Sequence, residues 1–421
     1  MLNGKILIGI TLLLLVVSMF SSNVDVVASK DMYEKKLCGD LEEMDISGSA
    51  KDSLLYMVRQ SRLQYLREHE DVLSNNIGPY HSYEEMTDLL HELESNYSDT
   101  MMLSSLGRTY EGREIWMVKL SDDVEMDEEE EPDVLLMGAH HGNEKPSFEV
   151  LIYFIVHVVE NYGRMNTDDD MDGLLNEDPI DGVDNDGDGM VDEDPSEDRV
   201  RDVVNNTEIY IIPMVNPDGV EAGTRKNRSP NHGPFGFRRE ITSYGVDLNR
   251  NYNYHWFFLY LFPGRYLGAT HYDDRSNVYR GEYPFCESET RAVKRFVDTH
   301  SVVISVSYHT YGELILYPWG YTTRSPWDKD VFVSIGENIS NINKYFLTQS
   351  VYLYPTLGDA DDWLYGRKGV IAYTIELGRS YAPGDPEVVS EMCFTHVGVN
   401  LYVCEVSHSI FSYGKNCFGS H

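Results

Sequence analysis

The alternation of short apolar segments with longer amphipathic segments is the feature that most constrains the fold of this chain. Five short runs have the composition of strands, and four longer runs with helical periodicity lie among them. Alternation of this kind builds a largely parallel sheet with helices packed on both faces. We therefore expect a three-layer α/β/α domain with a mixed, mostly parallel central sheet. The predicted strands are 115–120, 134–137, 208–213, 302–306 and 370–376, and the predicted helices are 83–97, 147–162, 288–299 and 329–345.

The first residues predict a secretion signal. Lys5 precedes an apolar run of 15 residues, 6–20. This run is shorter than the roughly 20 residues that span a membrane, and it is typical of a signal peptide. We interpret 1–29 as the signal peptide, with a retained N-terminal anchor as the alternative. Residues 30–78 are polar and charged and are expected to form a short pro-region or an N-terminal extension. Because no later stretch is apolar enough to span a bilayer, we expect a secreted protein without a stable membrane span.

Acidic residues are concentrated in two short windows. The chain has 70 Asp and Glu against 34 Lys and Arg, and its net charge is −36. A phosphate backbone would be repelled by this charge, so general nucleic-acid binding is excluded. Residues 122–133 contain nine acids and residues 168–198 contain 15, and neither window contains Lys or Arg. The remainder is only mildly acidic, so the acidity needs local explanations.

The second acidic window contains an internal repeat. Residues 168–179 and 184–195 both follow the pattern D-x-D-x-D-G-x-x-[DN]-E-D-P. Carboxylates at every second position, followed by glycine, can converge on one hard cation, and the repeat resembles the calcium-binding repeats of thrombospondin type 3. We interpret 166–198 as a calcium-binding insertion, with a solvated acidic linker as the alternative, and 122–133 as a solvated loop. The candidate calcium ligands are Asp168, Asp170, Asp172, Asp178, Asp184, Asp186, Asp188 and Asp194.

The loop after the strand 134–137 carries a candidate metal site. This strand leads into Gly-Ala-His-His-Gly-Asn-Glu, so His141 and Glu144 follow its carboxyl end, where sites in parallel sheets lie. A catalytic zinc ion needs a third protein ligand and an open position for water. His309 follows the strand 302–306 and is the candidate third ligand, although a histidine at a strand end can also be purely structural.

Seven motifs in order between residues 80 and 405 resemble the zinc metallocarboxypeptidases of the carboxypeptidase A/B family. The resemblance implies a zinc carboxypeptidase domain over 79–405 and a C-terminal tail over 406–421. The first motif reads His-Gly-Asn-Glu where His-Ala-Arg-Glu-Trp is expected, so it does not select a subgroup. The motifs are GAHHGNE at 138–144, IIPMVNPDG at 211–219, RKNR at 225–228, GVDLNRN at 245–251, YRGEYPFCESET at 279–290, HTYGELILYPWG at 309–320, and LYPTLGDADDW at 353–363 with IAYTIELG at 371–378.

The resemblance implies that one catalytic zinc ion is bound by His141, Glu144 and His309. Two histidines and one glutamate leave a coordination position open for water, as catalysis requires. Asp247 matches the family's carboxylate that orients the first histidine ligand. Glu376 matches the general base, which takes a proton from the attacking water and later passes it to the leaving amine.

The resemblance also assigns residues to the substrate. Arg225 matches the group that stabilises the oxyanion of the tetrahedral intermediate. Asn249 and Arg250 match the clamp on the terminal carboxylate, which a planar guanidinium can hold with two hydrogen bonds. Tyr354 matches the tyrosine that closes over that carboxylate, and Tyr311 is expected to contact the substrate. A clamp for a free carboxylate is typical of an exopeptidase.

The expected specificity depends on the side-chain pocket. Asp361 falls where members that prefer basic residues carry Asp at the base of this pocket, and Asp359 is a competing carboxylate. A buried carboxylate there would attract a C-terminal Lys or Arg, and dual basic and apolar preference is known in the family. The pairs expected to have non-proline cis peptide bonds, by the same resemblance, are Thr310–Tyr311 and Pro318–Trp319.

The resulting hypothesis is a secreted zinc carboxypeptidase that acts on the C-termini of peptides or proteins. The alternative is a zinc amidohydrolase, such as a deacylase or a cell-wall peptide hydrolase of the same superfamily. Those enzymes share H-x-x-E and a later histidine but usually alter the carboxylate clamp. A catalytically inactive binding protein would be expected to lack Glu376 or a zinc ligand. A calcium-binding adhesin is disfavoured because the repeat covers only about 30 of 421 residues.

Overall fold

The structure, a computed structural model, describes residues 80–128, 130–162, 195–233, 238–258 and 268–418. These residues belong almost entirely to one compact unit, made of Asn76–Gly163 and Arg199–His421. The predicted signal peptide 1–29 and extension 30–78 lie outside the described residues, as do all eight candidate calcium ligands between Asp168 and Asp194.

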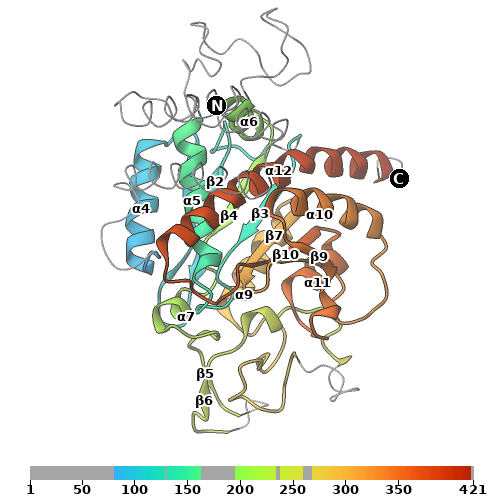
Figure 1. Ribbon diagram of the computed structural model, residues 1–421. Coiled ribbons are helices and arrows are strands. Elements are labelled where there is room, and N and C mark those ends of the chain that lie inside the picture. Colours follow the sequence, from blue (N-terminus) through green and yellow to red (C-terminus); the bar gives the residue numbers. More distant parts are fainter. Residues whose placement is uncertain (1–79, 129, 163–194, 234–237, 259–267, 419–421) are drawn as a thin grey trace, which may run out of the picture. The chain divides into compact units, whose positions relative to one another are not determined.

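The core of this unit is an eight-stranded sheet with the order β1-β2-β4-β3-β7-β10-β8-β9 (Figure 1). The pairs β3–β4, β3–β7, β7–β10 and β8–β9 are parallel, and β1–β2, β2–β4 and β10–β8 are antiparallel. The expected mixed, mostly parallel sheet is therefore confirmed. The strands are β1 Met101–Arg108, β2 Glu114–Leu120, β3 Asp133–Met137, β4 Glu208–Ile212, β7 Val302–Thr310, β8 Leu314–Tyr317, β9 Phe346–Gln349 and β10 Ile371–Leu377, with a separate ribbon of β5 Pro230–Asn231 and β6 Ser243–Tyr244.

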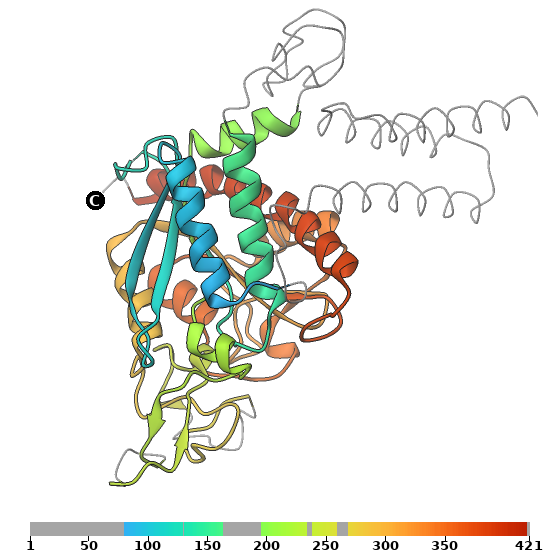
Figure 2. The same cartoon turned by 90° about the vertical axis from the view of Figure 1, so that its left-hand side faces the viewer.

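Helices cover both faces of the sheet. On one face the Tyr308 hydroxyl of β7 donates to Asn400 of α12, and Figure 2 shows α4 and α5 side by side. On the other face the ring of Tyr210 in β4 packs edge-on against Phe296 of α9. This arrangement confirms the three-layer prediction. The helices are α4 Tyr83–Asn96, α5 Pro146–Asn161, α6 Pro195–Val204, α7 Pro217–Ala222, α9 Ser288–Thr299, α10 Lys329–Asn343, α11 Ala360–Trp363 and α12 Pro386–Phe418, and the short helical turns are η2 Leu248–Arg250, η3 Ser350–Tyr352 and η4 Leu364–Lys368.

The C-terminal helix extends further than the sequence patterns indicate. Helix α12 runs from Pro386 to Phe418, so the expected tail 406–421 begins inside a helix rather than after the domain. The reason is tertiary contact beyond residue 405: Ser407 is fully buried, and the ring of His408 lies 3.0 Å (Nε2 to Oγ1) from Thr207, beside β4. Within the described ranges, α12 and every other helix are too short or too polar to cross a bilayer.

The two expected cis peptide bonds are present, at Thr310–Tyr311 and Pro318–Trp319. The first follows β7 and the second follows β8, two strands on either side of β10. Because β7 is parallel and β8 is antiparallel to β10, the first turn begins beside the end of β10 and the second lies toward its start.

Candidate active site

The three candidate metal ligands converge at one edge of the sheet. His141 and Glu144 lie in the loop after β3, and His309 lies near the end of β7, the parallel neighbour of β3. The Glu144 carboxylate is 2.8 Å from Nδ1 of His141 through Oε1 and 2.9 Å from Nδ1 of His309 through Oε2. All three side chains are buried. Because neighbouring parallel strands end at the same edge, the topology itself brings these ligands together.

The donor atoms of these side chains fit a zinc ion. The two Nδ1 atoms of His141 and His309 face each other at 3.1 Å, and all three ligand atoms lie within 4.8 Å of one another. Oδ1 of Asp247 lies 3.0 Å from Nε2 of His141. A proton on Nε2 leaves the lone pair of His141 on Nδ1, directed at the other ligands. Two imidazole nitrogens and one carboxylate are a donor set that suits catalytic zinc.

Close backbone packing holds the ligand loop in place. A Cβ atom on Gly142 would lie 1.9 Å from the backbone carbon of Gly219 in α7, so only glycine fits between the two ligands. The Asn216 amide donates to the backbone carbonyls of His140 and Arg225, at 3.2 and 3.3 Å. Backbone packing and hydrogen bonds therefore connect the three motifs at 138–144, 211–219 and 225–228.

Arg225 and Asp247 form a charged pair next to the ligands. Arg225 Nε donates to Oδ2 of Asp247 at 3.0 Å, and its Nη1 lies 3.4 Å from Oε1 of Glu144. Burial alone would raise the pKa of Asp247, but the charges of Arg225 and His141 outweigh burial and hold that pKa well below its ordinary value. Asp247 is therefore an ionised acceptor for both the arginine and the histidine.

The pKa of Glu376 is raised, whereas that of Asp247 is lowered. It lies near the end of β10 and pairs in register with His309 of β7. Burial, reinforced by the negative charge of Glu144, raises the pKa of Glu376 to about 8. A carboxyl group with a pKa near neutrality can both accept and release a proton, which is a property of general acid–base groups.

The residues expected to clamp the terminal carboxylate lie close together in the structure. Arg250 Nε donates to the carbonyl of Gly268 at 2.6 Å, and its Nη2 donates to the Tyr354 hydroxyl at 3.1 Å. Nδ2 of Asn249 lies 3.2 Å from Nε2 of His309, so these residues lie directly beside the candidate metal ligands. Tyr354 is 39 % exposed, so its side chain is partly accessible to solvent.

Two aspartates lie in the loop and helix that follow Tyr354. Asp361 is almost fully buried, and its Oδ2 accepts a hydrogen bond of 2.7 Å from Thr374 of β10. Burial, followed by the charge of Asp359, raises the pKa of Asp361 to about 7. Oδ2 of Asp359 is buried without a hydrogen-bond partner among the described residues. Thr374 was missed from the sequence, although it precedes Glu376 by two residues and so shares its face of the strand.

Tyr311 is less closely tied to the site. Its ring is 49 % exposed and packs edge-on against Tyr381, with the centroids 5.0 Å apart. The residue before it, Thr310, donates its backbone N–H to Oε2 of Glu144 at 3.2 Å. The structure therefore places the Tyr311 backbone near the ligands and its side chain at the surface.

Residues 86–385 match the zinc carboxypeptidase family, Peptidase_M14. The chain belongs to the zinc carboxypeptidase family. It is 29% identical over 322 residues to a zinc carboxypeptidase of Saccharothrix mutabilis subsp. capreolus, a match that covers 72% of this chain and 63% of the relative. It is 26% identical over 314 residues to carboxypeptidase B of Astacus astacus, covering 71% of this chain and 86% of that protein.

Two solved structures share the fold. Carboxypeptidase A of Helicoverpa armigera aligns with a TM-score of 0.61 and 20% identity, over 83% of this chain and 80% of its own. Thrombin activatable fibrinolysis inhibitor aligns with the same TM-score and 20% identity, over 78% and 75% of the two chains. Membership of this family supports zinc as the metal for the site formed by His141, Glu144 and His309. The signal peptide and the calcium-binding insertion stay predictions.

Proposed function

We propose that this protein is a secreted metallocarboxypeptidase that hydrolyses the C-terminal peptide bond of peptides or proteins. One observation carries the proposal: three convergent metal ligands lie beside both a partly buried carboxyl group of raised pKa and a guanidinium–phenol pair. The carboxyl group is Glu376, and the pair is Arg250 with Tyr354. The carboxyl group can transfer a proton, and the guanidinium–phenol pair can bind a free carboxylate. An exopeptidase needs both properties.

The chain's own residues account for proton transfer and charge stabilisation. A zinc ion held by the three ligands would supply a Lewis acid and lower the pKa of a coordinated water. Glu376 accepts the proton of the attacking water and later delivers it to the leaving amine. Arg225, held by Asp247 and Glu144, offers its guanidinium to the developing oxyanion. Asp247 keeps the His141 ring in the ligand orientation.

Substrate binding follows from the clamp and from the aspartates behind it. Arg250 and Asn249 hold the terminal carboxylate, and Tyr354 closes over it from its partly exposed position. Asp361 and Asp359 lie where the side chain of the terminal residue enters. Their buried carboxyl groups favour a C-terminal Lys or Arg, and the raised pKa of Asp361 lets the pocket also accept an apolar residue when that group is neutral.

The test is hydrolysis of blocked dipeptides ending in Arg, Lys, Phe and Glu, by the full chain with zinc and calcium present. We expect release of the C-terminal residue that a chelator abolishes and zinc restores. Glu376→Gln should also abolish release, whereas Glu337→Gln, an exposed change on α10, should not. No release from any dipeptide would refute the proposal, and cleavage of N-acyl amino acids alone would support the deacylase alternative.

We also propose that the acidic insertion binds calcium. The support is the twice-repeated spacing of carboxylates and glycine at 168–179 and 184–195. Calorimetric titration of the full chain with calcium should show binding that Asp186→Asn with Asp188→Asn weakens. Glu92→Gln, an exposed change on α4, serves as the matched control. Equal calcium binding by all of these variants would contradict this assignment.

A further inference from the structure

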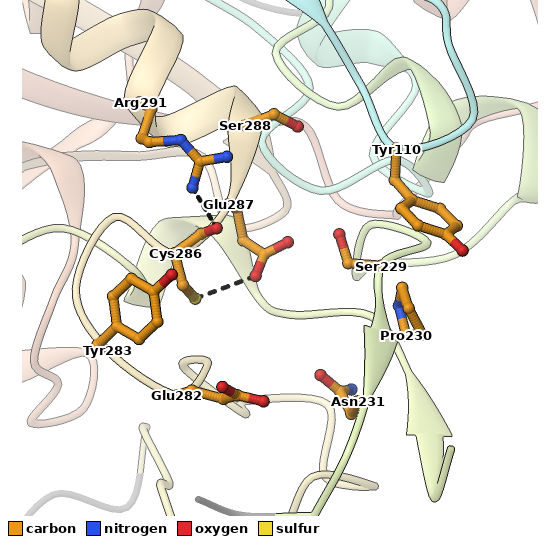
Figure 3. Close-up of a pocket in the computed structure, with 10 residues that line it drawn as sticks. All are labelled: Tyr110, Ser229, Pro230, Asn231, Glu282, Tyr283, Cys286, Glu287, Ser288 and Arg291. Atoms are coloured by element: carbon orange, nitrogen blue, oxygen red, sulfur yellow. Dashed lines mark hydrogen bonds between the residues drawn. The ribbon is translucent and has the colours of Figure 1, made fainter. Parts of the chain in front are cut away.

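A pocket of about 270 Å³ lies at the start of α9, separate from the candidate zinc site (Figure 3). Three segments line it: the turn between β1 and β2 with Tyr110, the start of β5 with Ser229 beside it, and the loop that leads into α9 with Glu282, Tyr283 and Glu287. We infer that this pocket is a binding site for a basic side chain, the guanidinium of Arg or the ammonium of Lys, on a polypeptide ligand.

The lining carries more negative than positive charge. The Glu287 side chain is buried at the floor, where its Oε2 accepts from Nδ2 of Asn227 at 2.7 Å. Glu282 lines the pocket with its side chain partly exposed. Arg291 also lines the pocket, but its Nη1 donates to the backbone carbonyls of the loop at Phe285 and Cys286. The pocket thus has two carboxylates but one guanidinium, and that guanidinium donates its hydrogen bonds to backbone carbonyls. The excess of negative charge favours the binding of a cation.

Aromatic rings complete the site. Tyr110 and Tyr283 are 58 % and 57 % exposed, and Figure 3 shows them on opposite sides of the space into which the Glu287 carboxylate projects. The faces of phenol rings attract cations. They also pack against the methylene groups of Lys or Arg, whose charged heads can then reach a carboxylate. A pocket of this size and composition therefore suits a long basic side chain.

The pocket opens at the same edge of the sheet as the candidate active site. Strand β2 runs antiparallel to β4, and β4 runs parallel to β3, so the β1–β2 turn lies at the edge where β3 ends. The floor is also tied to the carboxylate clamp. Asn251, the residue after Arg250, accepts a hydrogen bond from the Glu287 backbone N–H at 3.3 Å and donates to the Cys286 sulfur at 3.1 Å.

A polypeptide whose C-terminus occupies the clamp could place an upstream basic residue in this pocket. As a substrate contact this assignment rests on the proposed carboxypeptidase function. As a cation site it stands on the geometry of the pocket alone. The two parts therefore need different probes, one without a free carboxylate and one with it.

The first probe is the peptide acetyl-Gly-Arg-Gly-amide, titrated into the full chain at low ionic strength by calorimetry. Its amidated end cannot engage the clamp, and its citrulline analogue has the same shape without the charge. We expect the Arg peptide to bind about tenfold more tightly than the citrulline peptide. Glu282→Gln should weaken binding about fivefold, because it removes one partly exposed carboxylate. Glu337→Gln, which removes a charge from α10, should leave binding unchanged.

Asp361→Asn separates this pocket from the specificity pocket. If the Arg peptide binds at α9, this variant should bind as wild type does, and thermal unfolding should show that both variants are folded. Equal binding of the Arg and citrulline peptides would overturn the inference. Binding lost in Asp361→Asn but kept in Glu282→Gln would overturn it as well.

The second probe is a pair of peptides with a free C-terminal Arg and either Arg or citrulline at an upstream position. Upstream Arg should lower KM about fivefold at unchanged kcat, and Glu282→Gln should remove the difference. Equal KM values would overturn the substrate role. Absence of all cleavage would refute the proposed function, while the amidated-peptide titration would still decide whether the cation site exists.

Discussion

Asp247 and Asp361 are two buried aspartates at one edge of the sheet, yet their pKa values move in opposite directions. Asp247 faces Arg225 and His141, whose charges outweigh burial and lower its pKa. Asp361 has a hydroxyl donor, Thr374, and a second carboxyl group, Asp359, so burial dominates and raises its pKa to about 7. Burial alone therefore does not determine ionisation; the charge of the partner does.

The same contrast separates the proposed roles. A carboxylate that must orient a metal ligand has to stay ionised, and Asp247 has positive partners that ensure this. A group that must gain and lose a proton needs a pKa near neutrality, and Glu376, at about 8, has this property because burial and the charge of Glu144 act together. The following predictions test whether these groups behave as differently as their surroundings indicate.

Glu376→Gln should have the largest effect. It keeps the shape of the side chain but removes the proton acceptor, so kcat should fall about a thousandfold or more. Zinc content, measured by atomic absorption, should stay that of wild type, because Glu376 is not among the ligands. A variant that retains more than about a tenth of the wild-type kcat would contradict the role of Glu376.

Asp247→Asn should weaken metal binding rather than proton transfer. Loss of the negative acceptor for His141 Nε2 and for Arg225 should weaken zinc affinity about 10- to 100-fold. Competition with a fluorescent zinc chelator measures this affinity directly. Asp361→Asn is the matched control, since it changes a buried aspartate of the same region. Equal loss of zinc in both variants would remove the distinction drawn between them.

Asp361→Asn should change specificity. The ratio of kcat/KM for C-terminal Arg to that for C-terminal Phe should fall about tenfold, because the pocket loses the negative charge that attracts the cation of the substrate. Dipeptide hydrolysis at pH 8 measures the ratio. If Asp359→Asn lowers the ratio and Asp361→Asn does not, the competing carboxylate is the specificity residue.

The pH dependence of the same ratio should give the smallest effect. The Asp361 carboxyl is neutral below its pKa of about 7 and ionised above it, so attraction for Arg is present at high pH and is lost as pH falls. The Arg-to-Phe ratio should therefore rise several-fold between about pH 6 and pH 8. Titration of Glu376 affects both substrates alike and cancels in the ratio. A ratio that stays level in wild type, or that still rises in Asp361→Asn, would contradict this assignment.

Local patterns predicted most of the sheet but not its edges. The predicted strands correspond to β2, β3, β4, β7 and β10, and the predicted helices to α4, α5, α9 and α10. Strands β8 and β9 have only four residues each and leave no periodic signal. The edge strand β1 has eight residues, but its sequence MMLSSLGR lacks the regular apolar–polar alternation of a strand. The continuation of α12 past residue 405 depends on contacts with distant segments, such as that of His408 with Thr207. Patterns miss elements that are short, that lack a regular alternation, or that depend on tertiary contacts.

The sequence by itself determined which chemical groups the site would contain. The resemblance of its ordered motifs to the zinc carboxypeptidases named His141, Glu144 and His309 as one set, and residue type decides that these side chains can bind a metal. Tertiary structure alone decided how those groups and their neighbours ionise. Asp247 and Asp361 are the same residue type, and only the side chains that folding places beside them separate a permanent anion from a group that titrates near pH 7. Electrostatic interaction depends on distance in space and not along the chain, so it is absent from any local pattern.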